Sequence, residues 1–192
     1  MARTKEFDRE EALDRAMQVF WDKGYEATSL SELLEAMGIA RQSLYDTFGD
    51  KHALFLEALD RYETHRVDQL RSCLETAPSV TRAFRDIFES IVDESESEKR
   101  RGCMGVSAVV ELAPHDRELA KSIAARQRGL EAIFFRALEQ SRERGELAPS
   151  KDTRALARFL VGALQGLRVA ATADPKSAAL RDIARISLQA LE

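Results

Sequence analysis

The stretch that decides the fold runs from Thr28 to Lys51 and reads TSLSELLEAMGIARQSLYDTFGDK. A helix start is indicated at Ser29, because serine is a residue type that caps helix N-termini. Apolar residues then recur at helical spacing and predict the inward face of a helix of about two turns; they are Leu30, Leu33, Leu34 and Met37. Gly38 ends this helix.

A second short helix is predicted from Arg41 to Phe48, after the turn Gly38-Ile39-Ala40. Leu44 and Phe48 lie at positions i and i+4, so they share one side of this helix and its other side is free to face outward. Two short helices joined by a tight turn that contains glycine have the outline of a helix-turn-helix.

Helices are also predicted on both sides of this motif. Asp8 caps the start of a helix whose apolar stripe reaches Phe20, with Glu11 placed to reach back to the amide of the cap. After the motif, Gly49-Asp50 breaks and recaps the chain and begins a long periodic helix that runs toward Leu74. We expect this long helix to connect two modules.

Five further helical patterns follow Ala77-Pro78-Ser79, without an internal repeat, which predicts about nine helices in all. The charged run from Glu94 to Arg101 is most simply a solvated loop. The last two patterns, Thr153 to Ala171 and the one that Asp174-Pro175 begins, carry more small and apolar residues than an interior needs. We therefore expect these two helices to form a homodimer interface.

Composition agrees with a soluble, globular, all-α protein. The chain has 192 residues, of which 44% are hydrophobic and 32% charged, with 9 glycines and 4 prolines, and these values exclude a disordered or collagen-like polymer. Residues 1–56 contain 7 Lys/Arg and 11 Asp/Glu, whereas residues 57–192 contain 22 of each. Bulk basicity therefore gives no argument for nucleic-acid binding.

No pattern predicts a cofactor, a metal site or a catalytic site. The two cysteines, Cys73 and Cys103, lack metal-ligand spacing, and the three histidines have no ligand-like spacing or paired carboxylates. The chain also lacks a glycine-rich phosphate loop. Met1 to Glu6 has no apolar segment behind its charges, and no apolar run approaches a membrane span of about 18 residues. We expect a cytoplasmic protein with reduced thiols that is not an enzyme.

The segment from Thr28 to Lys51 closely resembles the DNA-binding segment of the TetR family of transcriptional repressors, and the resemblance extends over roughly residues 8–60. It implies a three-helix DNA-binding domain at residues 1–49, a connecting helix at 50–77, and a helical domain at 78–192 that binds an effector and dimerises. The stretch near Gly102-Cys103 and Glu111-Leu112-Ala113 is similar to a subset of the family.

The physics of DNA recognition agrees with this resemblance. A recognition helix fits the major groove, and the residues at its N-terminus reach base edges. Those residues here are Arg41, Gln42 and Ser43. Arginine can bind guanine O6 and N7, and glutamine can bind adenine N6 and N7, each pair contributing roughly 1–3 kcal/mol of discrimination. Which of the three residues reads a base stays open, and each is also compatible with an ordinary solvated position.

Three further residues are expected to contact the phosphate backbone: Thr28 through its hydroxyl at the start of a helix, and Tyr45 and Lys51 by their resemblance to contacts of the family. Packing of Tyr45 against the first helix and a plain surface role for Lys51 are the alternatives. The chain departs from the family at Ala40, where a Ser or Thr cap is common, and at Asp46, whose charge would repel a phosphate.

The C-terminal domain offers candidates for an effector pocket. Residues spaced to line its interior are Phe84, Phe88, Met104, Phe134 and Leu138, and candidate polar anchors are Gln165 and Arg168. Such a lining predicts a small hydrophobic or amphipathic effector, although most of these residues also fit a plain core.

Cys103 follows Arg100-Arg101-Gly102 at a predicted helix start, where amides and cations favour a thiolate. Some members of the family have a sensor cysteine in a similar context, so redox or electrophile sensing is one hypothesis for Cys103. The alternative is that Cys103 is a small buried residue.

These observations predict a repressor that a small molecule releases from a palindromic operator. Its two recognition helices would fit half-sites about 34–36 Å apart, or a multiple, in only one of two states. The rival interpretation is a helical protein-interaction adaptor that retains the helix-turn-helix as a scaffold. The acidic N-terminal region is the best argument for the adaptor, and an enzyme is a distant third.

Overall fold

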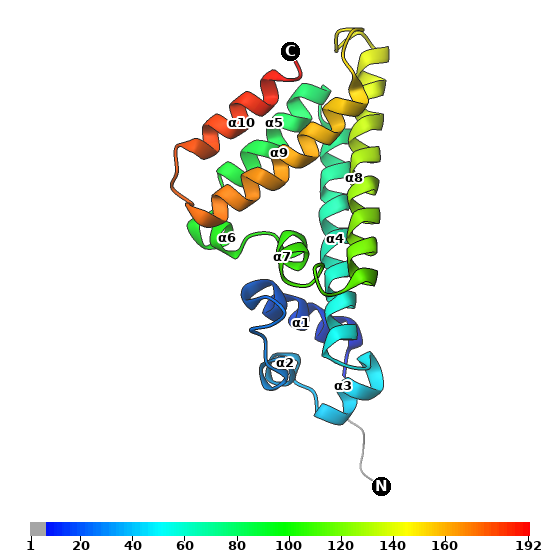
Figure 1. The fold of residues 1–192 in the computed structure, drawn as a ribbon, viewed down its shortest axis with the longest axis vertical. Helices are drawn as coiled ribbons and strands as arrows, with labels where there is room; N and C mark the ends of the chain where they lie inside the picture. The colour runs from blue at the N-terminus through cyan, green and yellow to red at the C-terminus, as the bar shows by residue number, and fades with distance from the viewer. Residues whose placement is uncertain (1–6) are drawn as a thin grey trace. The chain divides into compact units, whose positions relative to one another are not determined.

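The structure, a computed structural model, describes residues 7–192 and contains no β-strand within them (Figure 1). Its helices are α1 (Arg9–Lys23), α2 (Leu30–Met37), α3 (Arg41–Phe48), α4 (Lys51–Thr76), α5 (Val80–Val92), α6 (Glu96–Arg101), α7 (Met104–Glu111), α8 (Arg117–Glu143), α9 (Thr153–Ala173) and α10 (Ala179–Gln189). The predicted all-α class is confirmed. The segment considered for a signal peptide, Met1 to Glu6, lies outside the described residues.

The chain divides into two compact units within α4: unit 1 ends at His65, and unit 2 is Arg66–Glu192. Unit 1 holds α1 to α3 and the first part of α4, and unit 2 holds the rest of α4 and α5 to α10. Among the described residues, no helix is both long enough and apolar enough to cross a membrane.

Local capping explains where the helices of unit 1 begin. Asp8 accepts hydrogen bonds from the backbone N–H of Glu10 at 2.9 Å and of Glu11 at 3.0 Å, and so caps α1 as predicted. The Glu11 side chain does not reach back to this cap and instead pairs with Arg15. At α2, Ser29 and Glu32 form a complete capping box, which satisfies two amides that the first turn leaves unpaired.

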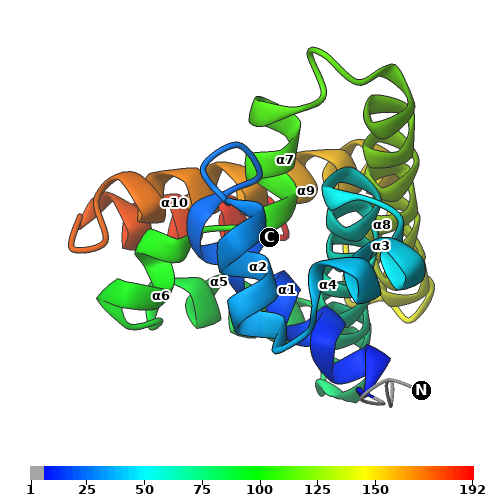
Figure 2. The same cartoon turned by 90° about the horizontal axis from the view of Figure 1, so that it is seen from below.

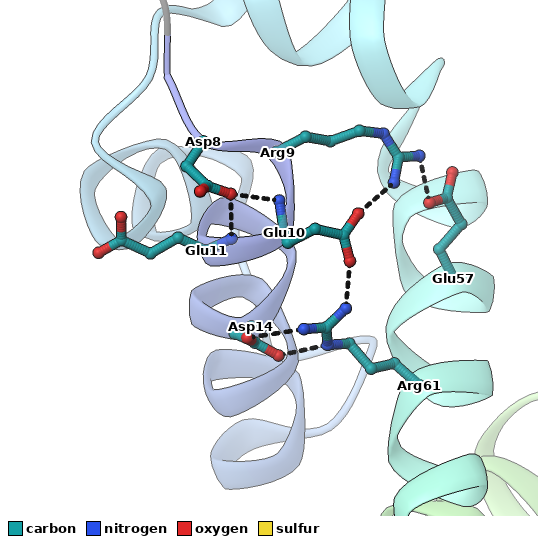
Figure 3. Close-up of polar contacts among 7 residues, drawn as sticks. All are labelled: Asp8, Arg9, Glu10, Glu11, Asp14, Glu57 and Arg61. Atoms are coloured by element: carbon teal, nitrogen blue, oxygen red, sulfur yellow. Dashed lines mark hydrogen bonds and ion pairs between the residues drawn. The ribbon is translucent and has the colours of Figure 1, made fainter.

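Ion pairs join α1 to α4 inside unit 1 (Figure 3). The Arg61 guanidinium binds both oxygens of Asp14, with Nη2 to Oδ2 at 2.9 Å, and also binds Glu10. One turn earlier on α4, Glu57 accepts from Arg9 at 2.6 Å. The same two helices also share an apolar interface. In it the rings of Phe20 on α1 and Phe55 on α4 meet edge to face, with centroids 5.1 Å apart.

Unit 2 has its own apolar core. Its α5 packs against both α9 and α10, and α8 packs against α9, which slants away from it in Figure 1. Figure 2 shows α8, α9 and α10 from below. Large side chains from α5, α8 and α9 fill the centre; they include Phe84, Phe88, Ile91, Phe134, Leu138 and Leu160.

The charged run after α5 is a helix where the sequence analysis expected a loop. Ser95 and Glu98 form a capping box at the start of α6, and three cations occupy its last turn, where they complement the helix dipole. Because this short helix was not predicted, the described residues contain ten helices, one more than the expected number of about nine.

Candidate nucleic-acid interface

The outward face of α3 is the first element of the candidate interface. Leu44 is fully buried and Phe48 almost so, which turns the opposite side of this short helix to solvent. Arg41 and Gln42 are exposed, Tyr45 is 43% exposed, and Ser43 is half-buried. Three of the four α3 side chains predicted to reach DNA are therefore exposed, and Tyr45 is not packed into the core.

The turn between α2 and α3 fixes how the second helix leaves the first. Gly38 adopts φ +67° and ψ 30°, a left-handed conformation that glycine reaches without steric cost. The N–H of Gly38 donates to the carbonyl of Leu34 at 3.0 Å, and the N–H of Ile39 donates to the same carbonyl at 3.3 Å. This closed turn, together with buried Met37 and Leu44, sets the orientation of the exposed face of α3.

Asp46, which departs from the family pattern, has a partner on α3 itself. The Gln42 amide donates to the Asp46 carboxylate at 2.8 Å across one turn. Because of this bond, Gln42 can bind a base only if it gives up Asp46 or reaches the base with its other N–H. Arg41, one residue earlier at the start of α3, makes no such bond in the described part of the chain.

Lys51 is held by an aromatic ring. Its ammonium lies 4.3 Å from the ring centroid of Tyr25, within the range of a cation–π interaction. Tyr25 in turn meets Phe55 and His52 edge-on, with centroids 5.1 and 6.0 Å apart. Burial, followed by the carboxylates of Glu26 and Asp50, raises the pKa of the Tyr25 hydroxyl above its ordinary value. Sequence analysis missed Tyr25, because its contact with Lys51 exists only in the folded unit.

The structure corrects the role predicted for the Thr28 hydroxyl. Thr28 is 1% exposed, and its hydroxyl donates to the carbonyl of Gly24 at 2.6 Å. A hydroxyl used in this way inside the protein is not presented to a phosphate. Exposed Ser29 caps α2 instead, so the surface at this helix start consists of Ser29 and backbone amides.

The acidic residues of unit 1 are largely engaged in structural contacts. Glu10, Asp14 and Glu57 pair with arginines between α1 and α4, and Asp50 accepts from the backbone N–H of Ala53 at 2.7 Å. Glu32 binds Lys23 and caps α2, and these hydrogen bonds, led by the one from Lys23, lower the pKa of Glu32 to about 2. Much of the negative charge of this unit is therefore taken up by helix caps and ion pairs.

Most of the predicted effector-pocket residues form solid core. Phe84, Phe88, Phe134 and Leu138 are fully buried, and the rings of Phe84 and Phe134 meet at 86° with centroids 4.9 Å apart. These four side chains belong to the core cluster of unit 2, and Met104 is buried as well. Gln165 faces solvent.

Of the seven residues predicted to form the pocket, Arg168 lines a cavity, and this cavity has a volume of about 270 Å³ between α4, α5 and α9. The other candidates do not line it.

Cys103 lies at the N-cap position of α7, as the sequence suggested, and it is half-buried. Its side chain makes no capping hydrogen bond. Within residues 7–192, no cluster of three or more histidine, cysteine or carboxylate side chains is arranged to hold a metal ion.

Comparison with known proteins agrees with this geometry. Residues 12–58 match the family model described as bacterial regulatory proteins, tetR family, and residues 80–186 match the tetracyclin repressor-like C-terminal domain. The chain is 39% identical to YezE of Bacillus subtilis (strain 168), an uncharacterized HTH-type transcriptional regulator, over the full length of both. It is 34% identical to the HTH-type transcriptional repressor ComR of Escherichia coli (strain K12), covering 97% of this chain and 90% of ComR.

Among solved structures, a cysteine mutant of the TetR family regulator CifR bound to 26-bp operator DNA is similar over all of both chains, with a TM-score of 0.86 and 33% identity. These matches extend over both compact units and include the helix-turn-helix of α2 and α3. The chain belongs to the TetR family of DNA-binding transcriptional regulators.

Proposed function

We propose that this protein is a cytoplasmic repressor that binds a palindromic operator as a homodimer and is released by a small-molecule effector. The observation that carries the proposal is the exposed face of α3, which Leu44 and Phe48 hold outward from the core of unit 1. A helix presented in this way fits the major groove of B-DNA. The repressor names of the relatives and the operator bound by CifR support the same function.

In this proposal Arg41 is the principal base-reading residue. It is exposed at the first position of α3, and its guanidinium can bind the O6 and N7 atoms of guanine together. Gln42 and Ser43 flank it, with Gln42 restrained by Asp46. Lys51 and Tyr45 contact phosphates and set the register of the protein on the duplex. Because the Thr28 hydroxyl is buried, Ser29 and the amides at the start of α2 replace it as the contact at that point.

The homodimer forms through α9 and α10. Phe159 and Val169 on α9 and Ile186 on α10 are large apolar residues with 48%, 53% and 52% of their surfaces exposed. Two exposed glycines, Gly162 and Gly166, continue the Phe159–Val169 stripe, and the space around each is open. A matching stripe on a second copy would bury these groups around a two-fold axis, and a two-fold dimer suits a palindromic operator.

Release follows from a difference in effector affinity between two states of the dimer. In the DNA-binding state the recognition helices reach half-sites about 34–36 Å apart, or a multiple of that spacing. An effector that binds better to a state with another spacing shifts the population away from the operator.

The test is binding of the purified protein to a palindromic fragment from upstream of its gene, measured at several salt concentrations. We expect the affinity to fall steeply with salt, and Arg41→Ala or Lys51→Ala to weaken it about tenfold or more. Lys121→Ala is the matched control, because Lys121 is exposed on α8 in the other unit and pairs with Glu118. A protein-interaction adaptor would bind no DNA fragment specifically, and neither Arg41→Ala nor Lys51→Ala would change its affinity for DNA.

Redox or electrophile sensing through Cys103 is a second candidate function. Its half-buried thiol stands at the N-cap of α7 without a capping bond, and the operator-bound CifR relative is named for substitutions at its cysteines. In this case a thiol reagent would release the wild-type protein from DNA, and Cys103→Ser would abolish the release. Cys73→Ser is the control, because burial, and then Asp86, raises the pKa of the Cys73 thiol. Unchanged release from Cys103→Ser would exclude this function.

A further inference from the structure

The cavity between α4, α5 and α9 has two kinds of wall. One is apolar, formed by Leu70, Ile87, Ile91 and Leu164, and the other carries polar groups, namely Arg66, Gln69, Asp86, Ser90 and Arg168, with Cys73 between them. A volume of about 270 Å³ is below the usual range for drug-sized ligands, and it suits a ligand of about ten non-hydrogen atoms. The shape and lining therefore fit a small molecule with one polar end.

Arg168 is the polar group with the most unused binding capacity. Its side chain is only 12% exposed, and both of its bonds to Glu94 come from Nη1, at 2.6 Å to each carboxylate oxygen. Its Nε is buried and has no hydrogen-bond partner among the described residues. A guanidinium has five N–H donors and normally binds a carboxylate through two of its nitrogens. A carboxylate that bonded to two of these nitrogens would therefore match the guanidinium better than Glu94 does.

The charge balance of the lining also favours an anion. Arg66 and Arg168 contribute two cations to the walls, and Asp86 contributes one carboxylate. Asp86 already pairs with Arg82 at 2.9 Å, so its charge is partly offset. A carboxylate in the cavity would meet Arg168 with its charged end and the leucine and isoleucine side chains with its apolar body.

The cavity between α5 and α10 is a weaker candidate. It is larger, at about 480 Å³, but its arginines, Arg85, Arg181 and Arg185, are exposed to solvent. An ion pair with an exposed arginine is screened by water and salt. The buried position of Arg168 makes the smaller cavity the better anion site.

We propose that the effector is a small carboxylate with an apolar body, and that it binds in the α4–α5–α9 cavity by replacing Glu94 on Arg168. This inference rests on the effector-released repressor proposed above. Between α5 and α6 only the Glu94 side chain loses its partner, and no covalent step is required.

Loss of the Arg168–Glu94 pair has a direct consequence for α6. Glu94 directly precedes Ser95, the N-cap of α6, so this pair ties the start of α6 to α9. Two other contacts join α6 to the region where α9 ends. Glu96 on α6 pairs with Lys176 at 2.9 Å, and Gly102, the C-cap of α6, lies close to Thr172 on α9. A ligand that takes Arg168 from Glu94 removes the first of these ties and leaves the other two.

The experiment is calorimetric titration of the purified full chain with hexanoate and benzoate, and with hexanamide and benzamide as uncharged counterparts. We expect at least one carboxylate to bind one site per chain at least tenfold more tightly than its amide. Arg168→Met should weaken that binding at least tenfold, whereas Arg71→Met, an exposed arginine on α4 that pairs with Asp68, should leave it unchanged. Glu94→Gln should tighten it, because it removes the competing carboxylate.

Ser90→Phe is a second test of the site, for use if the Arg168→Met variant does not fold. Ser90 lines the cavity and is exposed, so a phenylalanine at this position fills the space and leaves the Arg168–Glu94 pair in place. It should abolish carboxylate binding. Equal affinity for acid and amide, no binding of either carboxylate below about 10 mM, or weaker binding by Glu94→Gln would each overturn the proposal.

A separate titration with operator DNA distinguishes the site from the repressor function. Carboxylate binding that depends on Arg168 and also lowers operator affinity supports both. Binding that depends on Arg168 but leaves operator affinity unchanged supports the site and contradicts its role as the effector site. A chain that binds no DNA, with or without carboxylate, contradicts the repressor function and leaves the calorimetric result to decide the site.

Discussion

The two units of this protein use their charged residues differently. In unit 1, arginines on α1 and α4 pair with carboxylates of the neighbouring helix, as Arg61 does with Asp14. In unit 2, many ion pairs lie within one helix, three or four residues apart, such as Lys121 with Glu118 and Arg185 with Asp182. Pairs of this local kind contribute only about 0.3–0.5 kcal/mol each.

This difference teaches that net charge is a poor guide to the surface that binds DNA. Residues 1–56 carry more acid than base, yet the acids described by the structure are mostly occupied by caps and interhelical pairs. The α3 face keeps Arg41 exposed. Residues 57–192 contain equal numbers of acidic and basic residues, and the unusual surface of unit 2 is apolar, at Phe159, Val169 and Ile186.

The largest expected effect is at that apolar surface. Phe159→Glu combined with Val169→Glu places four carboxylates in the proposed two-fold interface, so we expect a monomer. Operator affinity should fall roughly 1,000-fold, because the second half-site is no longer tethered to the first. Sedimentation would give the mass, and titration with the full operator would give the affinity.

Unit 1 should be unaffected by this double substitution, which makes affinity for a single half-site the internal control. Leu160→Glu would not test the dimer interface, because Leu160 is fully buried and its loss would unfold unit 2. If the double variant remains a dimer, the α9–α10 interface is wrong and unit 2 must dimerise through another surface.

The next effect concerns Gly102, which lies between α6 and α7 with φ +71°. A Cβ at this position would lie 2.8 Å from the hydroxyl oxygen of Thr172 on α9. Backbone strain of this kind costs about 1–3 kcal/mol, and the close contact adds to it. Gly102→Ala should therefore lower the free energy of unfolding by about 3 kcal/mol in urea denaturation.

Gly145→Ala is the matched control, because Gly145 has φ +76° and open space where its Cβ would be. Gly145→Ala should lower the free energy of unfolding by about 1–2 kcal/mol, because only the backbone strain contributes. Adding Thr172→Ala should recover part of the loss in Gly102→Ala and none in Gly145→Ala. Equal losses for the two alanine variants would show that α6 and α9 do not depend on this contact.

The elements that sequence analysis predicted are those determined by nearby residues. The cap at Asp8 and the turn at Gly38 depend on contacts within a few positions, and the exposed face of α3 follows from the spacing of Leu44 and Phe48. The pair of Arg168 with Glu94 spans 74 positions, and no periodicity indicates it.

Two differences from the sequence expectations have different origins. The predicted effector pocket counted apolar residues at interior positions, but Phe84 and Phe134 fill that interior by packing against each other. Whether apolar residues leave a cavity depends on how their volumes fit together in three dimensions. The charged run at α6 looked like a solvated loop because the Ser95–Glu98 capping box was not recognised in it.

A smaller effect tests the aromatic support of Lys51 in unit 1. Tyr25→Leu removes the ring beneath the Lys51 ammonium and should reduce operator affinity by about 0.5–1 kcal/mol, the usual size of an exposed cation–π contact. Lys51→Ala should lower the slope of log affinity against log salt by about 0.9 for each phosphate contact that it removes. Titrations of both single variants and the double variant give the coupling energy.

If Tyr25 acts through Lys51, the double variant should bind DNA no worse than Lys51→Ala alone. Tyr25→Phe keeps the ring and should match the wild type. Additive losses in the double variant would mean that Tyr25 serves only the apolar core with Phe55.

The smallest effect is the pH dependence of the Glu32 contacts in unit 1. Hydrogen bonds from Lys23 and then Ser29 lower the pKa of Glu32 to about 2 in the folded protein, below its ordinary value of about 4.3 in an unfolded chain. The stabilisation is therefore complete above about pH 5 and declines as the pH falls toward 2, because the unfolded chain takes up the proton first. Urea unfolding should show Glu32→Gln less stable than wild type at pH 7 and equal to it near pH 2. Glu35→Gln, exposed on the same helix and outside these contacts, should show no such convergence. A constant difference between Glu32→Gln and wild type across this range would mean that α2 gains nothing from the charge of Glu32.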